Sequence, residues 1–117
     1  MKTHKDLKIW QLGIELVKDV YKTTSTFPKD ELYGLTSQLR RAAVSVPTNI
    51  AEGAARRGKK EFIHFLYIGL SSLSELETLL ILAQELDYIE DCKLQDQVTE
   101  IRMKTLKLIN YFELQEK

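Results

Sequence analysis

Apolar residues recur every three or four positions along most of this chain, which is the spacing of one face of an α-helix. The first such face consists of Leu7, Trp10, Ile14, Val17 and Tyr21. Hydroxyl-bearing residues at positions 23–26 then weaken the helical pattern. The pair Phe27-Pro28 stops it, because the residue before a proline avoids helical backbone angles. The pattern therefore predicts a first helix that ends at about residue 27.

Two more faces of the same kind follow. The second comprises Leu35, Leu39, Ala42, Ala43, Val46, Ile50 and Gly53, and it ends near Gly58, a plausible helix-terminating glycine. The third comprises Phe62, Leu66, Gly69, Leu73, Leu76, Leu80 and Ala83. Its regular alternation of four-residue and three-residue steps is typical of coiled-coil-like packing.

The third segment also carries a second apolar stripe, made of Phe65, Ser72, Leu79, Leu82 and Leu86. A helix that is apolar on more than one side is either the most buried helix of the fold or one that faces both the core and a partner chain. The second alternative places Phe65, Leu79 and Leu82 at an oligomer interface.

The last apolar face is Leu94, Val98, Ile101, Thr105, Leu108 and Phe112, after a turn at 87–91 in which Asp91 is a candidate cap. No strand-like alternation and no fixed-period repeat interrupts these four segments. Connections of about 2–8 residues favour antiparallel neighbours. We therefore expect an all-α fold, an antiparallel up-down-up-down four-helix bundle, with residues 1–117 forming one domain.

Pro47 falls inside the second predicted helix. An interior proline removes one hydrogen bond and clashes with the preceding turn, at a cost of about 3 kcal/mol or more. The pattern predicts a kink that wraps this helix around the bundle. A second interpretation is that the kink aims a polar stripe outward, consisting of Arg41, Ser45, Thr48, Asn49, Glu52 and Arg56.

Charge is balanced over the whole chain and uneven along it. The 117 residues carry 17 basic and 17 acidic side chains, so no net field draws the protein toward nucleic acid or membrane. Six basic residues nevertheless flank the proline segment: Arg40, Arg41, Arg56, Arg57, Lys59 and Lys60. They predict either a polyanion site or a solvated helix end, since cations near a helix C-terminus also complement its dipole.

No constellation of catalytic or metal-binding residues is visible. Two histidines, His4 and His64, lack a paired metal-ligand spacing, and the two glycines around residue 55 follow no strand and lack the spacing of a phosphate loop. The single Cys92 rules out an intrachain disulfide and suits a reducing compartment. No apolar run approaches the length of a membrane span. We expect a cytoplasmic, non-enzymatic protein with no cofactor, no metal and no membrane partner.

Two blocks of sequence carry a family resemblance. "FPKDELYGLTSQLRRAAVSVPTNIAEGAAR" followed by "EFIHFLYIGLSSLSELETLLILAQELDYI" resembles the four-helix-bundle proteins encoded in intervening sequences of bacterial large-subunit ribosomal RNA. The similarity extends from "LKIWQLGIELVKDVY" to the last helix, and the segment 40–53 is its most specific part. The resemblance implies an antiparallel bundle without known enzymatic activity and with a poorly defined cellular role.

A related branch of that family is the accessory protein of diversity-generating retroelements, a homopentamer that binds nucleic acid and a reverse transcriptase. The resemblance therefore implies a homo-oligomer, with a pentamer as one expected form, and RNA, DNA or a polymerase as partners. This chain departs from that branch because it is neutral rather than strongly basic, with an acidic cluster of Glu75, Glu77, Glu85, Asp87, Glu90 and Asp91. A local basic site stays open, and so does a protein-interaction role without nucleic-acid binding. A metal-dependent or small-ligand enzyme ranks third.

Overall fold

Four long helices account for most of the structure. The computed structural model describes residues 3–90 and 93–116. Its elements are the short 3₁₀ turn η1 (His4–Asp6), α1 (Lys8–Thr24), the 3₁₀ turn η2 (Lys29–Glu31), α2 (Leu35–Ala54), α3 (Lys59–Glu85) and α4 (Lys93–Glu116). No strand occurs among the described residues. The predicted all-α fold is therefore confirmed.

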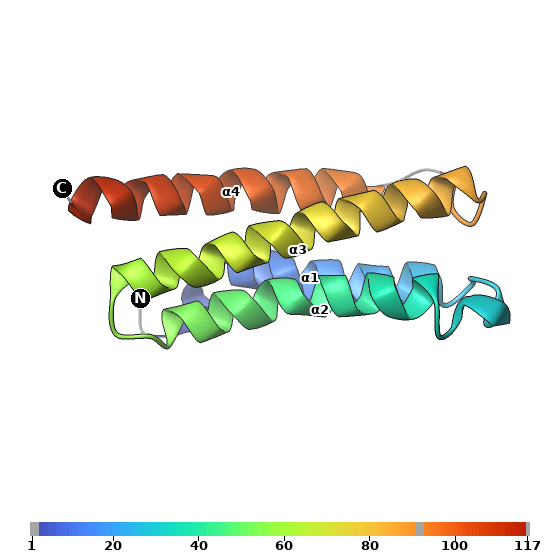
Figure 1. Ribbon diagram of the computed structural model, residues 1–117, viewed down its shortest axis with the longest axis horizontal. Helices are drawn as coiled ribbons and strands as arrows, with labels where there is room; N and C mark the ends of the chain where they lie inside the picture. Colours follow the sequence, from blue (N-terminus) through green and yellow to red (C-terminus); the bar gives the residue numbers. More distant parts are fainter. Residues whose placement is uncertain (1–2, 91–92, 117) are drawn as a thin grey trace.

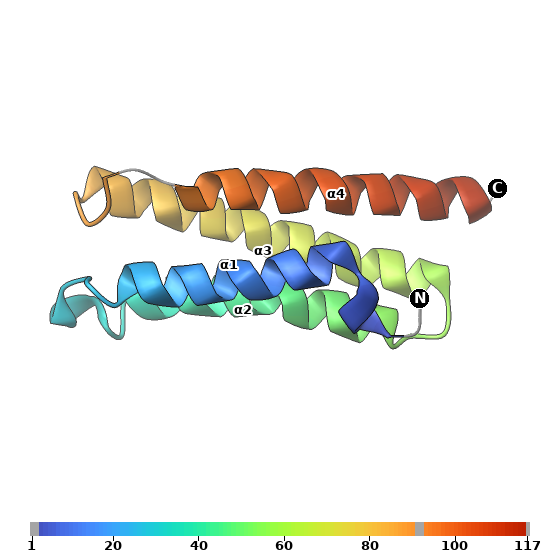
Figure 2. The same ribbon diagram turned by 180° about the vertical axis from the view of Figure 1, so that it is seen from behind.

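The helices lie side by side along one axis of a molecule that measures 49 × 19 × 19 Å. In Figures 1 and 2 the chain turns back at each end of the rod, so that successive helices run in opposite directions. Within the described ranges, α1 packs against α2 and α4, and α3 packs against α2 and α4, whereas no Cα atoms of the diagonal pairs lie within 8 Å of each other. This arrangement is a four-helix bundle.

The core face of α1 differs from the predicted one. The buried residues are Ile9, Gly13, Leu16, Val20 and Thr24, one position out of phase with the expected stripe. Of that expected stripe, Trp10, Ile14 and Val17 are half-buried and Tyr21 is exposed. Both stripes have helical spacing, so periodicity alone could not choose between them.

Helix α3 is the centre of the core. Nine of its residues are buried: Phe62, Leu66, Gly69, Ser72, Leu73, Leu76, Leu79, Leu80 and Ala83. Leu79 has an exposed fraction of only 7% and belongs to the hydrophobic core of its own chain. It therefore lacks the exposure that we expected of an oligomer-interface residue, and the second stripe of α3 is partly core.

By length and composition, α3 is apolar enough to cross a membrane, which the sequence pattern did not indicate. The core helix of a bundle passes the same test. In this fold the buried apolar side chains of α3 pack against α2 and α4, whereas Tyr67, Ile81 and Leu82 of the same helix are exposed. The absence of a membrane partner stays a prediction.

Helix α2 continues through Pro47 without interruption. Pro47 is buried against α1, and a Cβ added to Gly13 would lie 3.2 Å from the Cβ of Pro47. The glycine thus leaves room for the proline ring between the two helices. A kink at Pro47 stays a prediction.

The core face of α4 follows the expected pattern through its first three turns. Leu94, Val98, Ile101 and Thr105 are buried, but the next buried position is Ile109, while Leu108 and Phe112 are half-buried. The shift by one residue follows from the 3.6-residue period of the helix, which a strict seven-residue pattern does not keep. The candidate cap Asp91 and the single Cys92 lie outside the described residues.

Candidate nucleic-acid interface

The six basic residues predicted as one site separate into two groups. Arg40 and Arg41 lie in the first half of α2, and the other four lie at and after its C-terminal end. The 16 residues between Arg40 and Arg56 correspond to roughly 24 Å of helix. No single phosphate can contact both groups, so each group needs its own description.

Arg40 is fixed against α1. Its Nε donates a hydrogen bond to Thr24 Oγ1 at 2.9 Å, and its guanidinium carbon lies 4.5 Å from the centre of the Tyr21 ring. Thr24 is buried, and its hydroxyl in turn donates to the carbonyl of Val20. A hydrogen bond and a cation–π contact at the same side chain indicate that Arg40 connects α2 to α1.

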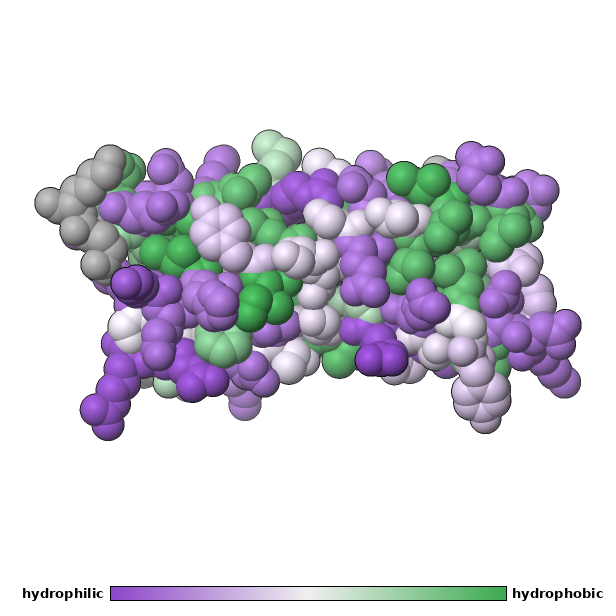
Figure 3. All heavy atoms as spheres, viewed as in Figure 1, coloured by the Kyte–Doolittle hydropathy of each residue, from purple (hydrophilic) through white to green (hydrophobic). Residues whose placement is uncertain are grey.

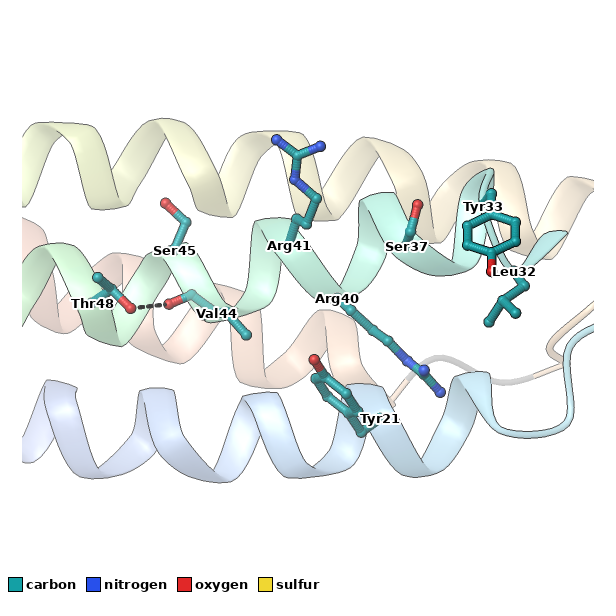
Figure 4. A pocket seen from close by; sticks show the side chains of 9 residues that line it. All are labelled: Tyr21, Leu32, Tyr33, Ser37, Arg40, Arg41, Val44, Ser45 and Thr48. Carbon is teal, nitrogen blue, oxygen red and sulfur yellow. Dashed lines mark hydrogen bonds between the residues drawn. The ribbon is translucent and has the colours of Figure 1, made fainter.

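Arg41 is exposed and points the other way, toward α3, as Figure 4 shows. It shares a shallow hollow with Gln38, Ser45 and the exposed Glu75 of α3, without an ion pair among the described residues. The nearby carboxylate lowers the attraction of this arginine for a phosphate. Arg40 and Arg41 together therefore make a weaker anion site than their sequence suggests.

The second group lies at the turn between α2 and α3. The guanidinium of Arg56 stacks over the ring of Phe65 at 4.8 Å from its centre, and Lys59 donates a hydrogen bond to Gln115 of α4. Arg57 and Lys60 are exposed. In the described part of the chain none of these four residues forms an ion pair. Their positive charges are therefore open to an external anion.

The fold adds further lysines to this group. The N-terminal turn η1 packs against α2, which brings Lys5 and Lys8 to the same end of the rod as the α2–α3 turn (Figures 1 and 2). We call this set the basic end; it consists of Lys5, Lys8, Arg56, Arg57, Lys59 and Lys60. Lys5 and Lys8 are far from the others in sequence, which is why the sequence pattern did not include them.

At the opposite end of the rod, acidic residues outnumber basic ones. This end contains the turn η2 and the connection from α3 to α4, with the acidic residues Asp30, Glu31, Glu85, Asp87, Glu90 and Asp96 around Lys29 and Lys93. The basic end also holds the carboxylates of Asp6, Glu52, Glu61 and Glu113, so the zero net charge of the chain conceals a partial separation of charge along the rod. Such a separation lets a neutral protein present one local surface to a polyanion.

Hydrogen bonds tie the acidic end together. Glu31 accepts from the backbone N–H of Leu35 at 3.2 Å, which caps α2, and from the hydroxyl of Tyr88 at 2.9 Å. The hydrogen bond to Glu31, with some burial and the nearby carboxylates of Glu31 and Asp30, raises the pKa of Tyr88 above its usual value of 10.0. These contacts give the acidic end a structural role.

A groove runs along the outer side of the α1–α2 pair. One hollow of about 690 Å³ is lined by Tyr21, Leu32, Tyr33, Ser37, Arg40, Arg41, Val44, Ser45 and Thr48 (Figure 4). A second hollow of about 360 Å³ shares Val44 and Thr48 with it and continues to Trp10, Ile14 and Val17. We call both together the α1–α2 groove. Tyr33 stands at one end with an exposed fraction of 93%.

Sequence reasoning missed this groove, because it assigned the stripe of α1 that lines it to the core. The apolar pair Leu32-Tyr33, in a connection otherwise rich in polar residues, was the available signal. Of the other expected interface positions, Leu82 is exposed, and Phe65 is half-buried under Arg56.

The described residues contain no group of three or more histidine, cysteine, aspartate or glutamate side chains that could hold a metal ion. His4 packs edge-on against Trp10, and His64 packs edge-on against Phe65. Each histidine thus has an aromatic neighbour and stands apart from the other.

Comparison with known proteins identifies one family. The sequence model of the 23S rRNA-intervening sequence proteins matches residues 5–110, which include α1, α2, α3 and most of α4. No individually curated protein matches the chain.

Proposed function

The chain belongs to the 23S rRNA-intervening sequence protein family, and from this membership we propose a non-enzymatic bundle that associates with nucleic acid, RNA first, through its basic end. The observation that supports the proposal is the charge separation along the rod. Six exposed cations that form no ion pair among the described residues gather at one end, in excess over the carboxylates there, and acidic residues outnumber basic ones at the other.

The contacts at the basic end suit phosphate binding rather than base reading. Arginine and lysine side chains that meet phosphates set the position of a protein on a nucleic acid without reading its sequence. The stacking of Arg56 on Phe65 and the hydrogen bond of Lys59 to Gln115 hold two of the cations in place. Binding should therefore show little sequence preference and fall steeply with salt.

The rest of the proposal follows the family resemblance. The bundle acts as a homo-oligomer, with a pentamer as one expected form, in the cytoplasm and without cofactor or metal. Several copies would bring several basic ends into one assembly. The uninterrupted passage of α2 through Pro47 is compatible with a gentle bend there, which would set the direction of the basic end.

The test is fluorescence anisotropy with a labelled structured RNA and a labelled duplex DNA. The variant Arg56/Arg57/Lys59/Lys60→Gln should bind at least about tenfold more weakly than the natural protein, because it loses four phosphate contacts. The matched control is Lys18/Lys22/Lys29/Lys93→Gln, which removes the same charge from exposed positions outside the basic end. Circular dichroism checks that both variants are folded. Equal loss of binding in the two variants would contradict the proposal.

A second candidate is a protein adaptor, for a polymerase for example, without direct nucleic-acid binding. The exposed apolar groove and the exposed Leu82 favour it. It predicts no anisotropy change with either nucleic acid at low salt, and it attributes the basic end to solvation alone.

A further inference from the structure

Exposed tyrosines are the side chains of this bundle that suit contact with a nucleobase, because every base has a face on which an aromatic ring can stack. Among the described residues, the exposed tyrosines are Tyr21, Tyr33, Tyr67 and Tyr111. Tyr21 already contacts the guanidinium of Arg40, and Tyr33 follows η2 at the acidic end. The other two, Tyr67 and Tyr111, lie in the first half of α3 and near the end of α4.

Tyr67 and Tyr111 lie on different sides of the bundle. Arg102 of α4 forms an ion pair with Glu77 of α3 at 3.2 Å, which identifies the side of α4 that faces α3. Tyr111 comes nine residues after Arg102, which is about two and a half turns of helix. Tyr111 therefore lies on the side of α4 that faces away from α3, and Tyr67 belongs to a separate surface.

Tyr67 shares the outer face of α3 with a lysine and a histidine. Lys60, His64 and Tyr67 are spaced four and three residues apart, so they are neighbours on one side of the helix, and all three are exposed. Ser71 continues this row, and its hydroxyl donates a hydrogen bond to the carbonyl of Tyr67. The row contains no carboxylate. Lys60 and Tyr67 are about 10 Å apart along the helix, a distance that a short stretch of one strand spans.

Arg56 and Phe65 form a second flat surface beside this row. The guanidinium carbon of Arg56 lies 4.8 Å from the centre of the Phe65 ring, and the ring of His64 packs edge-on against Phe65 at 5.6 Å. Arg56 is exposed, so one face of its guanidinium covers the ring and the other meets solvent. Arginine planes and aromatic rings are the groups on which unpaired bases stack. Because His64 contacts Phe65 and neighbours Tyr67, it joins the two stacking surfaces.

The acidic residues of α3 lie mostly beyond this region. Residues 59–74 include two lysines, one histidine and a single carboxylate, Glu61, whereas the remainder of the helix carries Glu75, Glu77 and Glu85. Glu61 and Glu52 form no ion pair in the described part of the chain. At the left of Figure 3, where α3 begins, strongly hydrophilic side chains border hydrophobic ones. Positive charge combined with exposed aromatic rings is typical of sites that bind single-stranded nucleic acid.

We propose that the basic end binds single-stranded nucleic acid, with one base stacked on Tyr67, another stacked on the guanidinium of Arg56, and the strand crossing α3 over His64. The proposal rests on the proposed function and names the form of nucleic acid that the same site takes. A duplex keeps its bases paired and stacked on one another, so their faces are not available to side chains. Stacking tolerates any base, which agrees with a site that has little sequence preference.

The experiment is fluorescence anisotropy at about 0.15 M salt, with a labelled single-stranded RNA that has no self-complementarity and with the duplex of that RNA and its complement. The natural protein should bind the single strand more tightly than the duplex. Tyr67→Ala should weaken binding of the single strand by about fivefold or more, because it removes one stacked base. Its binding of the duplex should change by less than about twofold, since no stacking is lost there.

Two further variants separate stacking from other effects. Tyr67→Phe keeps the ring and removes the hydroxyl, so it should retain the natural affinity for the single strand. Tyr111→Ala is the matched control, because Tyr111 has a similar exposed fraction, 55% against 49% for Tyr67, but lies on the other side of the bundle. It should also retain the natural affinity. All three substitutions are at exposed positions, and circular dichroism checks that each variant is folded.

Four results would overturn this inference and leave the proposed function intact: a duplex bound as tightly as the single strand, unchanged single-strand binding by Tyr67→Ala, a loss in Tyr67→Phe as large as in Tyr67→Ala, and equal losses in Tyr67→Ala and Tyr111→Ala. A natural protein that binds neither nucleic acid at low salt would overturn the proposed function itself, and this inference with it.

Discussion

The two apolar stripes of α1 lie one residue apart in sequence and have opposite surroundings. Ile9, Leu16 and Val20 face the core, and Leu16 and Val20 are completely buried. Ile14 and Tyr21, on the neighbouring stripe, line an open groove. Apolar spacing therefore identifies a helix well but does not say which of two apolar sides a bundle will bury.

The two stripes should differ most in how much free energy of unfolding is lost when a side chain is truncated to alanine. Leu16→Ala should lower the free energy of unfolding by about 2–5 kcal/mol, because it leaves a cavity in a filled core. Ile14→Ala, on the groove side of the same helix, should cost less than about 1 kcal/mol, since the position already meets solvent. Urea unfolding followed by circular dichroism gives both values. Equal costs would contradict the opposite surroundings described for the two stripes.

Close packing also distinguishes one buried position of the bundle from another. A Cβ added to Gly53 would lie 2.7 Å from Phe65 Cβ and 3.0 Å from Phe62 Cδ1, so α2 or α3 must move. Gly53→Ala should therefore destabilise the protein by about 1–3 kcal/mol. Gly69→Ala is the matched control in α3, where no atom lies within 4 Å of the added Cβ. There the better helix propensity of alanine should stabilise by about 0.5–1 kcal/mol. The same sign for both changes would contradict the packing described for Gly53.

The adjacent residues Arg40 and Arg41 should differ in how much each contributes to stability. Arg40→Ala removes the hydrogen bond to Thr24 and the contact with Tyr21, and should cost about 1–2 kcal/mol of stability. Arg41→Ala removes an exposed side chain that forms no ion pair within the described ranges, and it should change stability by less than about 0.5 kcal/mol. Thermal unfolding of the two variants in parallel measures the difference. A larger loss for Arg41 would reverse the roles given to these residues.

The smallest expected effect is a change in the pH dependence of folding stability, which arises from Tyr88 at the acidic end. The pKa of Tyr88 is raised in the folded protein, so the neutral hydroxyl is the favoured form there. Its contribution to stability is complete below the unfolded pKa of 10.0 and is lost as the pH rises through the higher folded pKa. The fall in stability above pH 10 should be shallower in Tyr88→Phe than in the natural protein. Identical alkaline profiles would mean that the hydrogen bond to Glu31 has no effect on folding.

Much of the fold follows from the sequence because the core of a bundle repeats with the helix period. All predicted core positions of α2 and α3 are buried except the half-buried Leu35, and the buried faces are wider than predicted because they also include Thr36, Pro47, Ser72 and Leu79. The errors occur where two apolar stripes compete, as in α1, or where the pattern drifts, as between Leu108 and Ile109 in α4. Leu79 was assigned to a partner interface because a single helix cannot reveal how much of its surface its own neighbours cover.

The candidate site was less predictable, because it depends on contacts between segments that are distant in sequence. Arg40 of α2 is held against α1 by its hydrogen bond to Thr24. The basic end includes Lys5 and Lys8 only because η1 packs against α2. The six residues that the sequence grouped as one site therefore became two groups at roughly 24 Å. Charge counting gave zero for the chain and could not reveal a basic end and an acidic end.

The central claim is that the basic end binds nucleic-acid phosphates, and the salt dependence of RNA binding tests it most directly. The slope of log K against log salt should be clearly negative for the natural protein. It should become shallower by roughly 3 in Arg56/Arg57/Lys59/Lys60→Gln, because each lost phosphate contact removes about 0.7–0.9 from the slope. The control Lys18/Lys22/Lys29/Lys93→Gln should keep the natural slope. A natural protein whose binding does not depend on salt, or a slope left unchanged by the first variant, would contradict the account.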